Sequence, residues 1–155
     1  MEGAGLRVLL EPGRSLVAEA GVLLTRVLYR KRNGAKEFVI VDASMTELIR
    51  PALYSAYHEI VPLRRSARGT IRADIVGPVC ETGDFLALAR PFPPVRRGDV
   101  VAIFGAGAYG MAMSSNYNAR PRAAEVLVNG GRATVVRRRE TWEDLVGPEE
   151  SPRPL

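Results

Sequence analysis

A thiol and a carboxylate stand side by side where an apolar run of the sequence ends. Cys80 and Glu81 close the segment Gly-Pro-Val-Cys-Glu at 77–81, and the turn residues Gly83 and Asp84 follow. A lone cysteine is more often a small buried apolar residue than a reactive one. The adjacent Glu81 favours a functional interpretation, because burial of its carboxylate is unfavourable unless it meets a cation. We expect both reactive groups to emerge where the chain turns.

Two other segments combine arginine with groups that can hold an anion. Glu-Pro-Gly-Arg at 11–14 places backbone N–H groups and the Arg14 guanidinium at the end of an apolar run, which suits a phosphate or a carboxylate. Arg50 and Tyr54 are four residues apart beside Pro51, so in a helical turn they would face one side and could clamp one carboxylate. An ordinary polar turn and a surface pair are the alternatives.

A glycine-rich run at 105–110, Gly-Ala-Gly-Ala-Tyr-Gly, suggests close approach of the backbone to a ligand. It matches only part of the dinucleotide-binding glycine pattern, and no strand-helix-strand unit follows, so a Rossmann site is excluded. Tyr109 would supply a hydroxyl group within this run. The single histidine, His58, is interpreted as a structural residue and not as a catalyst.

Composition excludes several other classes of function. One cysteine and one histidine in 155 residues rule out a disulfide framework and leave too few ligands for a Cys/His zinc site, so no metal is expected. The net charge of +5 comes from scattered arginines with acidic residues among them, which disfavours nucleic-acid binding. The apolar runs are far shorter than the ~20 residues that span a bilayer. The first residues lack a signal-peptide pattern, which favours the cytoplasm.

The elements that must position these residues are mostly short strands. Turn residues separate the apolar segments, and Asn33-Gly34 predicts a hairpin. Short helical pieces are predicted at 44–49, 51–58 and 141–145. Many short strands indicate a mainly β barrel or sandwich. The strands are predicted at 6–10, within 16–30, and at 37–42, 70–80, 85–89, 100–104, 125–128 and 133–138.

Both lysines of the chain, Lys31 and Lys36, lie in the polar turn region around Asn33-Gly34. A lysine that forms a Schiff base usually has its pKa lowered by desolvation or by a neighbouring cation. A solvated turn offers little desolvation, so neither lysine suits that chemistry.

Taken in order, these motifs resemble the diaminopimelate decarboxylases, a branch of the fold-type III, pyridoxal-phosphate-dependent decarboxylases of ornithine, diaminopimelate and arginine. The resemblance runs from about Leu6 to Leu145, and it departs from the family at Ser44, where glycine is usual. It rests on the motifs at 11–14, 41–42, 45–54, 58–59, 77–84, 105–110 and 115–118.

The resemblance implies an enzyme of two parts, an N-terminal α/β barrel with the cofactor lysine and a C-terminal β-domain that closes the site in a homodimer. Residues 1–15 would then be a remnant of the last barrel strand and its loop. Residues 16–147 would form the C-terminal domain, a Greek-key-like barrel or sandwich, and 148–155 a disordered tail. Without the barrel and its Schiff-base lysine, we expect the chain to be inactive alone.

The resemblance also implies roles for the residues singled out above. Pyridoxal 5'-phosphate would contact Tyr109 and four consecutive residues, Glu11, Pro12, Gly13 and Arg14. Arg14 and Tyr109 would also reach the substrate, and Arg50 and Tyr54 would bind its distal carboxylate. Glu81 would hold the distal ammonium of diaminopimelate, and Cys80 would deliver the proton that replaces carbon dioxide. Cys80 and Glu81 would serve the neighbouring subunit's site.

Two alternatives stay open. An ornithine or arginine decarboxylase acts on a substrate without a distal carboxylate, which would leave Arg50 with no evident role. A non-catalytic β-domain that regulates a complete decarboxylase would not need Arg14, Arg50, Cys80, Glu81 and Tyr109 together.

Overall fold

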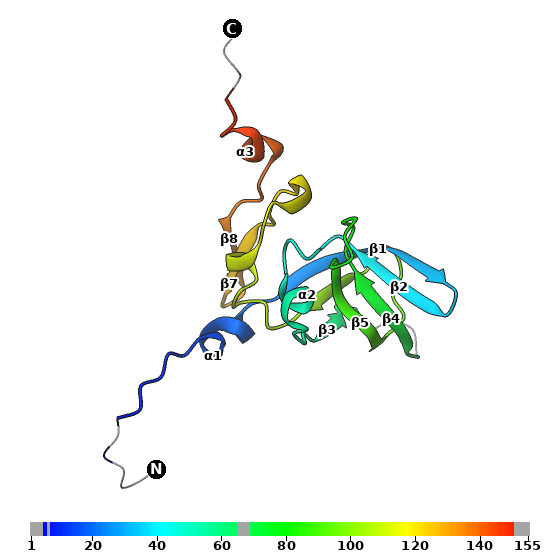
Figure 1. Ribbon diagram of the computed structural model, residues 1–155, viewed down its shortest axis with the longest axis horizontal. Helices are drawn as coiled ribbons and strands as arrows, with labels where there is room; N and C mark the ends of the chain where they lie inside the picture. The colour runs from blue at the N-terminus through cyan, green and yellow to red at the C-terminus, as the bar shows by residue number, and fades with distance from the viewer. Residues whose placement is uncertain (1–4, 6, 65–68, 151–155) are drawn as a thin grey trace.

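The chain folds around one curved sheet of six strands, in the order β3-β6-β1-β2-β4-β5 (Figure 1). The computed structural model describes residues 5, 7–64 and 69–150. The strands of this sheet are β1 (Leu23–Asn33), β2 (Lys36–Val41), β3 (Ile60–Pro62), β4 (Ile71–Val76), β5 (Phe85–Phe92) and β6 (Val100–Ile103). The short helices are α1 (Arg14–Val17), η1 (Ala18–Ala20), α2 (Arg50–Tyr54), η2 (Met111–Met113), η3 (Tyr117–Ala119) and α3 (Trp142–Val146).

The long strand β1 joins the two halves of the sheet. Its first residues, from Leu23 to Arg26, pair antiparallel with β6, and its later residues pair antiparallel with β2. The predicted hairpin is confirmed: Asn33 faces Lys36 across the turn, and Gly34 has the positive φ of +59° that such a turn requires. The pairing of β2 with β4 is parallel, which no local sequence pattern indicated.

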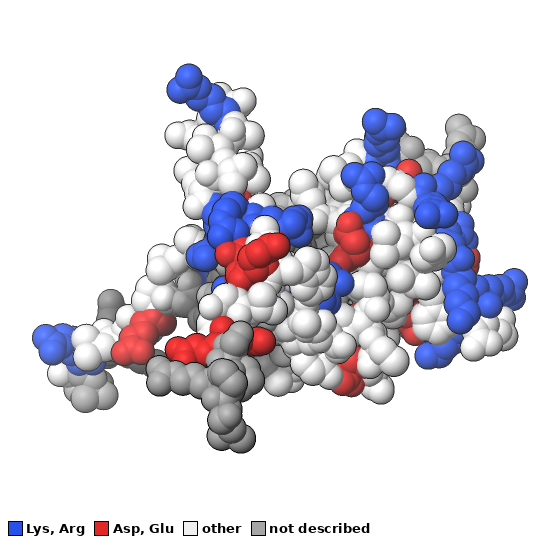
Figure 2. Space-filling model, turned by 90° about the horizontal axis from the view of Figure 1, so that it is seen from above, with Lys and Arg blue, Asp and Glu red and all other residues white. Residues whose placement is uncertain are grey.

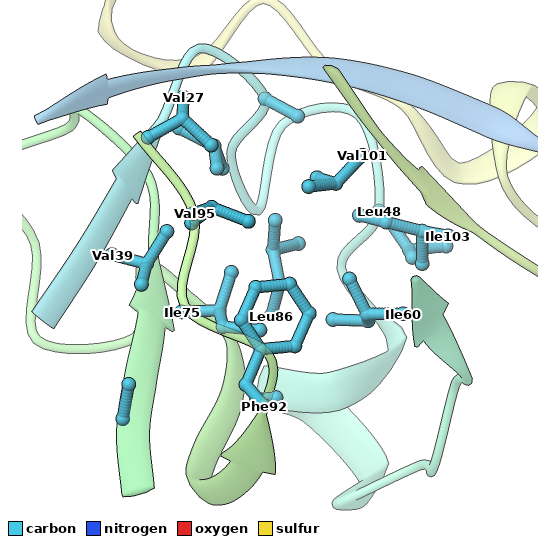
Figure 3. Close-up of a cluster of buried hydrophobic side chains, with 14 residues drawn as sticks. Val27, Val39, Leu48, Ile60, Ile75, Leu86, Phe92, Val95, Val101 and Ile103 are labelled. Carbon is cyan, nitrogen blue, oxygen red and sulfur yellow. The ribbon is translucent and has the colours of Figure 1, made fainter. Parts of the chain in front are cut away.

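The sheet curls until its two edge strands come close to each other. Arg90 of β5 donates a hydrogen bond from Nη1 to the carbonyl oxygen of His58, two residues before β3 (3.0 Å). The mainly β, barrel-like fold is therefore confirmed. Figure 3 shows the core inside the curl, where side chains from all six strands and from the loops converge. They include Val27, Val39, Leu48, Ile60, Ile75, Leu86, Phe92, Val95, Val101 and Ile103.

A second, two-stranded sheet of β7 (Glu125–Asn129) and β8 (Arg132–Arg137) lies apart from the first (Figure 1). Its turn residues Gly130 and Gly131 have φ values of +53° and +88°. The helix α3 follows it, and Thr141 caps that helix in a reciprocal arrangement with Asp144. The strands predicted at 125–128 and 133–138 and the helix at 141–145 are thus confirmed within a residue or two.

Three local predictions differ from the structure. Residues 7–10 form no strand and are exposed, because no described segment pairs with their backbone; Leu6 lies outside the described residues. The segment 45–47 is a turn and not a helix. The helix α2 ends at Tyr54, since Ser55 adopts a left-handed φ of +52°. The predicted tail at 148–155 falls mostly on residues 151–155, which the structure does not describe.

The surface carries both signs of charge. Figure 2 shows basic side chains along the end of the molecule at which the β1–β2 hairpin lies, and acidic side chains interspersed elsewhere. No helix in the described part of the chain is long and apolar enough to cross a membrane. Within the same ranges, no three side chains of His, Cys, Asp or Glu gather as metal ligands.

Candidate functional site

Arg50 is a buried cation on α2. It opens α2 with Pro51 in the first helical turn, and its side chain is only 8% exposed. Among the described residues, its Nη1 atom has no hydrogen-bond partner. A buried guanidinium N–H without an acceptor is unfavourable, so this position is prepared for an anion. Tyr54, at the other end of the helix, is exposed, and only Arg50 of the predicted clamp is buried.

Tyr109 lies beside this cation. The Arg50 guanidinium carbon is 5.9 Å from the centre of the Tyr109 ring, within the range of a cation–π contact. Tyr109 has an unusual φ of +66° within the glycine-rich run 105–110. Its hydroxyl oxygen would be 3.2 Å from a β-carbon placed on Gly13. The structure therefore brings Gly13, Arg50 and Tyr109 together.

The glycines explain why this loop can sit where it does. A β-carbon on Gly107 would lie 2.0 Å from the carbonyl oxygen of Val17, and one on Gly21 would lie 2.3 Å from the α-carbon of Gly107. The backbone N–H of Ala106 donates to Gly21 (2.9 Å) and that of Gly107 to Ala18 (3.0 Å). Close backbone contact, not a dinucleotide, is the structural reason for these glycines.

A hollow of about 220 Å³ lies beside Arg14 and Gly105, and Arg50 and Tyr109 are not among its lining residues. Arg14 at the start of α1, His58 and Phe104 are among its lining residues. His58 is 2% exposed, and its Nδ1 pairs with the carbonyl oxygen of Phe104 at 2.8 Å. Its Nε2 atom is buried and has no hydrogen-bond partner among the described residues, so only one of its two ring nitrogens is satisfied. Burial lowers its pKa, and the charges of Arg50 and Arg14 act in the same direction. The three residues that precede Arg14 in the chain, Glu11, Pro12 and Gly13, are exposed.

Cys80 and Glu81 form a second group on an exposed loop. The loop is shaped by the buried carboxylate of Asp84, which accepts hydrogen bonds from the backbone N–H groups of Met45 and Val79, both at 2.7 Å. A β-carbon on Gly77 would lie 2.4 Å from Asp84 Oδ2, so only glycine fits there. Both reactive groups emerge where the chain turns, as the sequence indicated.

Glu81 is exposed and meets no cation among the described residues, so the condition of burial in the sequence argument is not fulfilled. Its carboxylate is exposed and accepts a hydrogen bond from the Tyr117 hydroxyl at 3.0 Å. That bond lowers the pKa of Glu81 below 4.5, with help from the backbone N–H groups of Gly83 and Thr82. Because the side chain is exposed, no cation is required for its charge. Tyr117 and Asp84 stand in motifs that the sequence offered, but sequence reasoning gave neither of them a role.

The first group includes Arg50 of α2, and the loop of the second group packs against the same helix. Gly83 of the Cys80 loop lies against Ala52 of α2, to whose β-carbon its own added β-carbon would be 3.8 Å. Among the described residues, no hydrogen bond or ion pair joins Cys80 or Glu81 to Arg14 or Arg50. One chain thus presents a buried cation beside a tyrosine and, separately, a thiol with a carboxylate.

Comparison with known proteins gives a consistent result. The family model of the pyridoxal-dependent decarboxylase C-terminal sheet domain matches residues 16–107. The diaminopimelate decarboxylase of Aquifex aeolicus is 53% identical over 148 residues, which are 96% of this chain and 35% of that protein. That of Pseudomonas aeruginosa is 54% identical over 149 residues, 96% of this chain and 36% of its own length.

A solved structure shares the fold as well as the sequence. The crystal structure of diaminopimelate decarboxylase from Helicobacter pylori complexed with L-lysine has a TM-score of 0.85 and 45% identity, over 95% of this chain and 36% of that one. The chain therefore spans about a third of the length of the relatives that it matches.

Proposed function

Because the chain belongs to the pyridoxal-dependent decarboxylases, in which it corresponds to the C-terminal sheet domain, we propose that it contributes this domain to a diaminopimelate decarboxylase. The complete enzyme would remove carbon dioxide from meso-2,6-diaminopimelate and release L-lysine. Residues 16–147 would form the domain, residues 1–15 would lead from the barrel, 148–155 would be a tail, and the enzyme would be cytoplasmic.

This proposal is carried by the buried Nη1 atom of Arg50, which has no hydrogen-bond partner in the described part of the chain. Diaminopimelate has a second amino-acid end, so its distal carboxylate is an anion of the right charge and shape for a guanidinium. Ornithine and arginine have no distal carboxylate and would leave Arg50 buried without a partner. Arg14 and Tyr54 would complete the contacts to the substrate.

The residues present fit pyridoxal 5'-phosphate. The hydroxyl of Tyr109 lies so close to Gly13 that a side chain there would disturb it, which suits a backbone cradle for a flat ligand. Glu11, Pro12, Gly13, Arg14 and Tyr109 would hold the cofactor. When bound, pyridoxal phosphate supplies the electron sink that decarboxylation needs. The protein's own part is to orient the substrate and to deliver a proton.

Cys80 and Glu81 would act on the other side of the substrate. The exposed thiol of Cys80 would give its proton to the carbon that has lost carbon dioxide, and Glu81 would hold the distal ammonium. Their separation from Arg50 on one chain favours an arrangement in which they reach a neighbouring subunit's site. We therefore include a homodimer in the proposal.

The chain alone would not catalyse the reaction. Both lysines are exposed and lie on β1 and β2, and Lys36 pairs with Asp74 at 3.4 Å. Neither has the desolvated surroundings of a cofactor-bearing lysine. A regulatory domain is the second candidate function. The presence of both the exposed thiol of Cys80 and the buried Arg50 favours the catalytic function instead.

The test is to join the chain to the N-terminal two thirds of the Aquifex aeolicus relative, which we call the joined enzyme, and to measure carbon dioxide release. We expect decarboxylation of meso-diaminopimelate and little of ornithine or arginine, while the unjoined chain stays inactive. Preference for ornithine or arginine would contradict the proposed substrate. A folded joined enzyme without any activity would favour the regulatory alternative.

A further inference from the structure

Tyr117 contacts the one carboxylate proposed to recognise the substrate's ammonium. Its hydroxyl donates to Glu81 Oε2 at 3.0 Å, and the backbone N–H of Gly83 approaches Oε1 at 3.4 Å. Tyr117 is 36 residues from Glu81, so the contact is tertiary. With one donor on each oxygen, the carboxylate is fixed in one orientation and keeps lone pairs for a further donor.

The two residues before Tyr117 bind to two different parts of the chain. The backbone N–H of Ser115 donates to the carbonyl of Thr46 (3.0 Å), next to the Asp84-bound Met45. On the other side, Asn116 donates to Glu140 Oε2 (2.6 Å), and the same carboxylate accepts two hydrogen bonds from Arg122. Arg122 lowers the pKa of Glu140 to about 2, so this anchor keeps its charge in neutral solution.

The electrostatics of the pair are reciprocal. The Tyr117 hydroxyl is the largest cause of the lowered pKa of Glu81, and Glu81 in turn raises the pKa of Tyr117 above 10.0. A hydrogen bond from a neutral phenol to a carboxylate favours the protonated tyrosine and the ionised glutamate. The pair is therefore a neutral donor beside a negative acceptor at neutral pH.

We propose that Tyr117 is a positioning residue for Glu81, whose carboxylate it holds in the orientation that receives the distal ammonium of an amino-acid substrate. The identity of that ammonium rests on the proposed function. The Tyr117–Glu81 contact does not, because both partners belong to this chain.

The first measurement uses the 155-residue chain labelled with ¹³C at the glutamate carboxyl carbons. The Glu81 signal is assigned by its loss in Glu81→Gln and is then titrated from low pH to neutral. In Tyr117→Phe, which keeps the ring, we expect the pKa of Glu81 to rise. The matched control is Tyr29→Phe on β1, and it should leave Glu81 unchanged. An equal titration of Glu81 in Tyr117→Phe and in the unchanged chain would overturn the proposal.

The reciprocal measurement guards against a change of fold in Tyr117→Phe. In Glu81→Gln, a ¹³C-labelled Tyr117 should ionise at lower pH than in the unchanged chain; an unchanged midpoint would again contradict the contact. In the joined enzyme, Tyr117→Phe should raise KM for diaminopimelate severalfold with a much smaller change in kcat. If both titrations behave as expected and KM is unaffected, the contact stands and its role toward the ammonium is overturned.

Discussion

The hydroxyl oxygen of Tyr109 lies 3.2 Å from the place that a β-carbon on Gly13 would occupy. This contact joins two segments that are almost a hundred positions apart, the 105–110 loop and the Glu-Pro-Gly-Arg motif. The same tyrosine ring lies 5.9 Å from the guanidinium of Arg50. Gly13, Arg50 and Tyr109 thus lie together. A substitution at each of them tests a different part of the proposed function.

Gly13→Ala should disturb the Tyr109 hydroxyl, because a contact of 3.2 Å requires the neighbour to give by a few tenths of an ångström. We expect weaker binding of pyridoxal phosphate by the joined enzyme, measured by absorbance titration. Tyr109→Phe removes the crowded oxygen, so its effect in the Gly13→Ala background should be smaller than in the unchanged protein. Fully additive effects would show that the two residues act independently.

Asp84→Asn should destabilise the chain, because the buried carboxylate accepts two backbone N–H groups and an amide offers only one acceptor atom. We expect a loss of about 1–3 kcal/mol in the free energy of unfolding, measured in urea. Asp99→Asn is the control, since Asp99 accepts one backbone N–H in an exposed turn. Equal losses for the two variants would refute the structural role given to Asp84.

His58 should make stability depend on pH. Burial lowers the pKa of His58 in the folded chain below 6.5, the ordinary value that the unfolded chain keeps. Between the folded and the unfolded pKa, the unfolded chain therefore binds the proton more readily. Stability is therefore present above pH 6.5 and decreases as the pH falls below it. In His58→Gln we expect the difference between the unfolding free energies at pH 7.5 and 5.5 to shrink. An unchanged difference would mean that His58 does not titrate as its surroundings indicate.

Much of the fold could be predicted because its signals are local. Asn33-Gly34 specifies a hairpin by backbone conformation alone, and Thr141 with Asp144 specifies the start of α3. The parallel pairing of β2 with β4 and the separation of β7–β8 depend on packing between distant segments, which a linear pattern does not encode. The apolar run at 7–10 is predicted as part of a strand because hydrophobicity is its only signal, and no segment that the structure describes pairs with it.

In the candidate site, too, residues with a local signal could be predicted and residues that act through distant contacts could not. Cys80, Arg50 and the glycine-rich run could be singled out from residue type and spacing. Tyr117 lies in the 115–118 motif, but no role could be given to it, because its relevance lies in one hydrogen bond across 36 positions. Asp84 resembled an ordinary turn residue, and only its burial shows that it shapes the loop of Cys80. The roles given to Cys80 and Glu81 stay predictions until the neighbouring subunit is tested.

The most direct test of the central claim is kcat/KM of the joined enzyme for meso-diaminopimelate after Arg50→Gln. Loss of a buried charge partner costs about 2–5 kcal/mol, so we expect a decrease of at least about 30-fold. Arg97→Gln is the control, because Arg97 is an exposed cation stacked on Tyr29. An Arg50→Gln enzyme as efficient as the control would contradict the assignment of Arg50 to the distal carboxylate, and with it the proposed substrate.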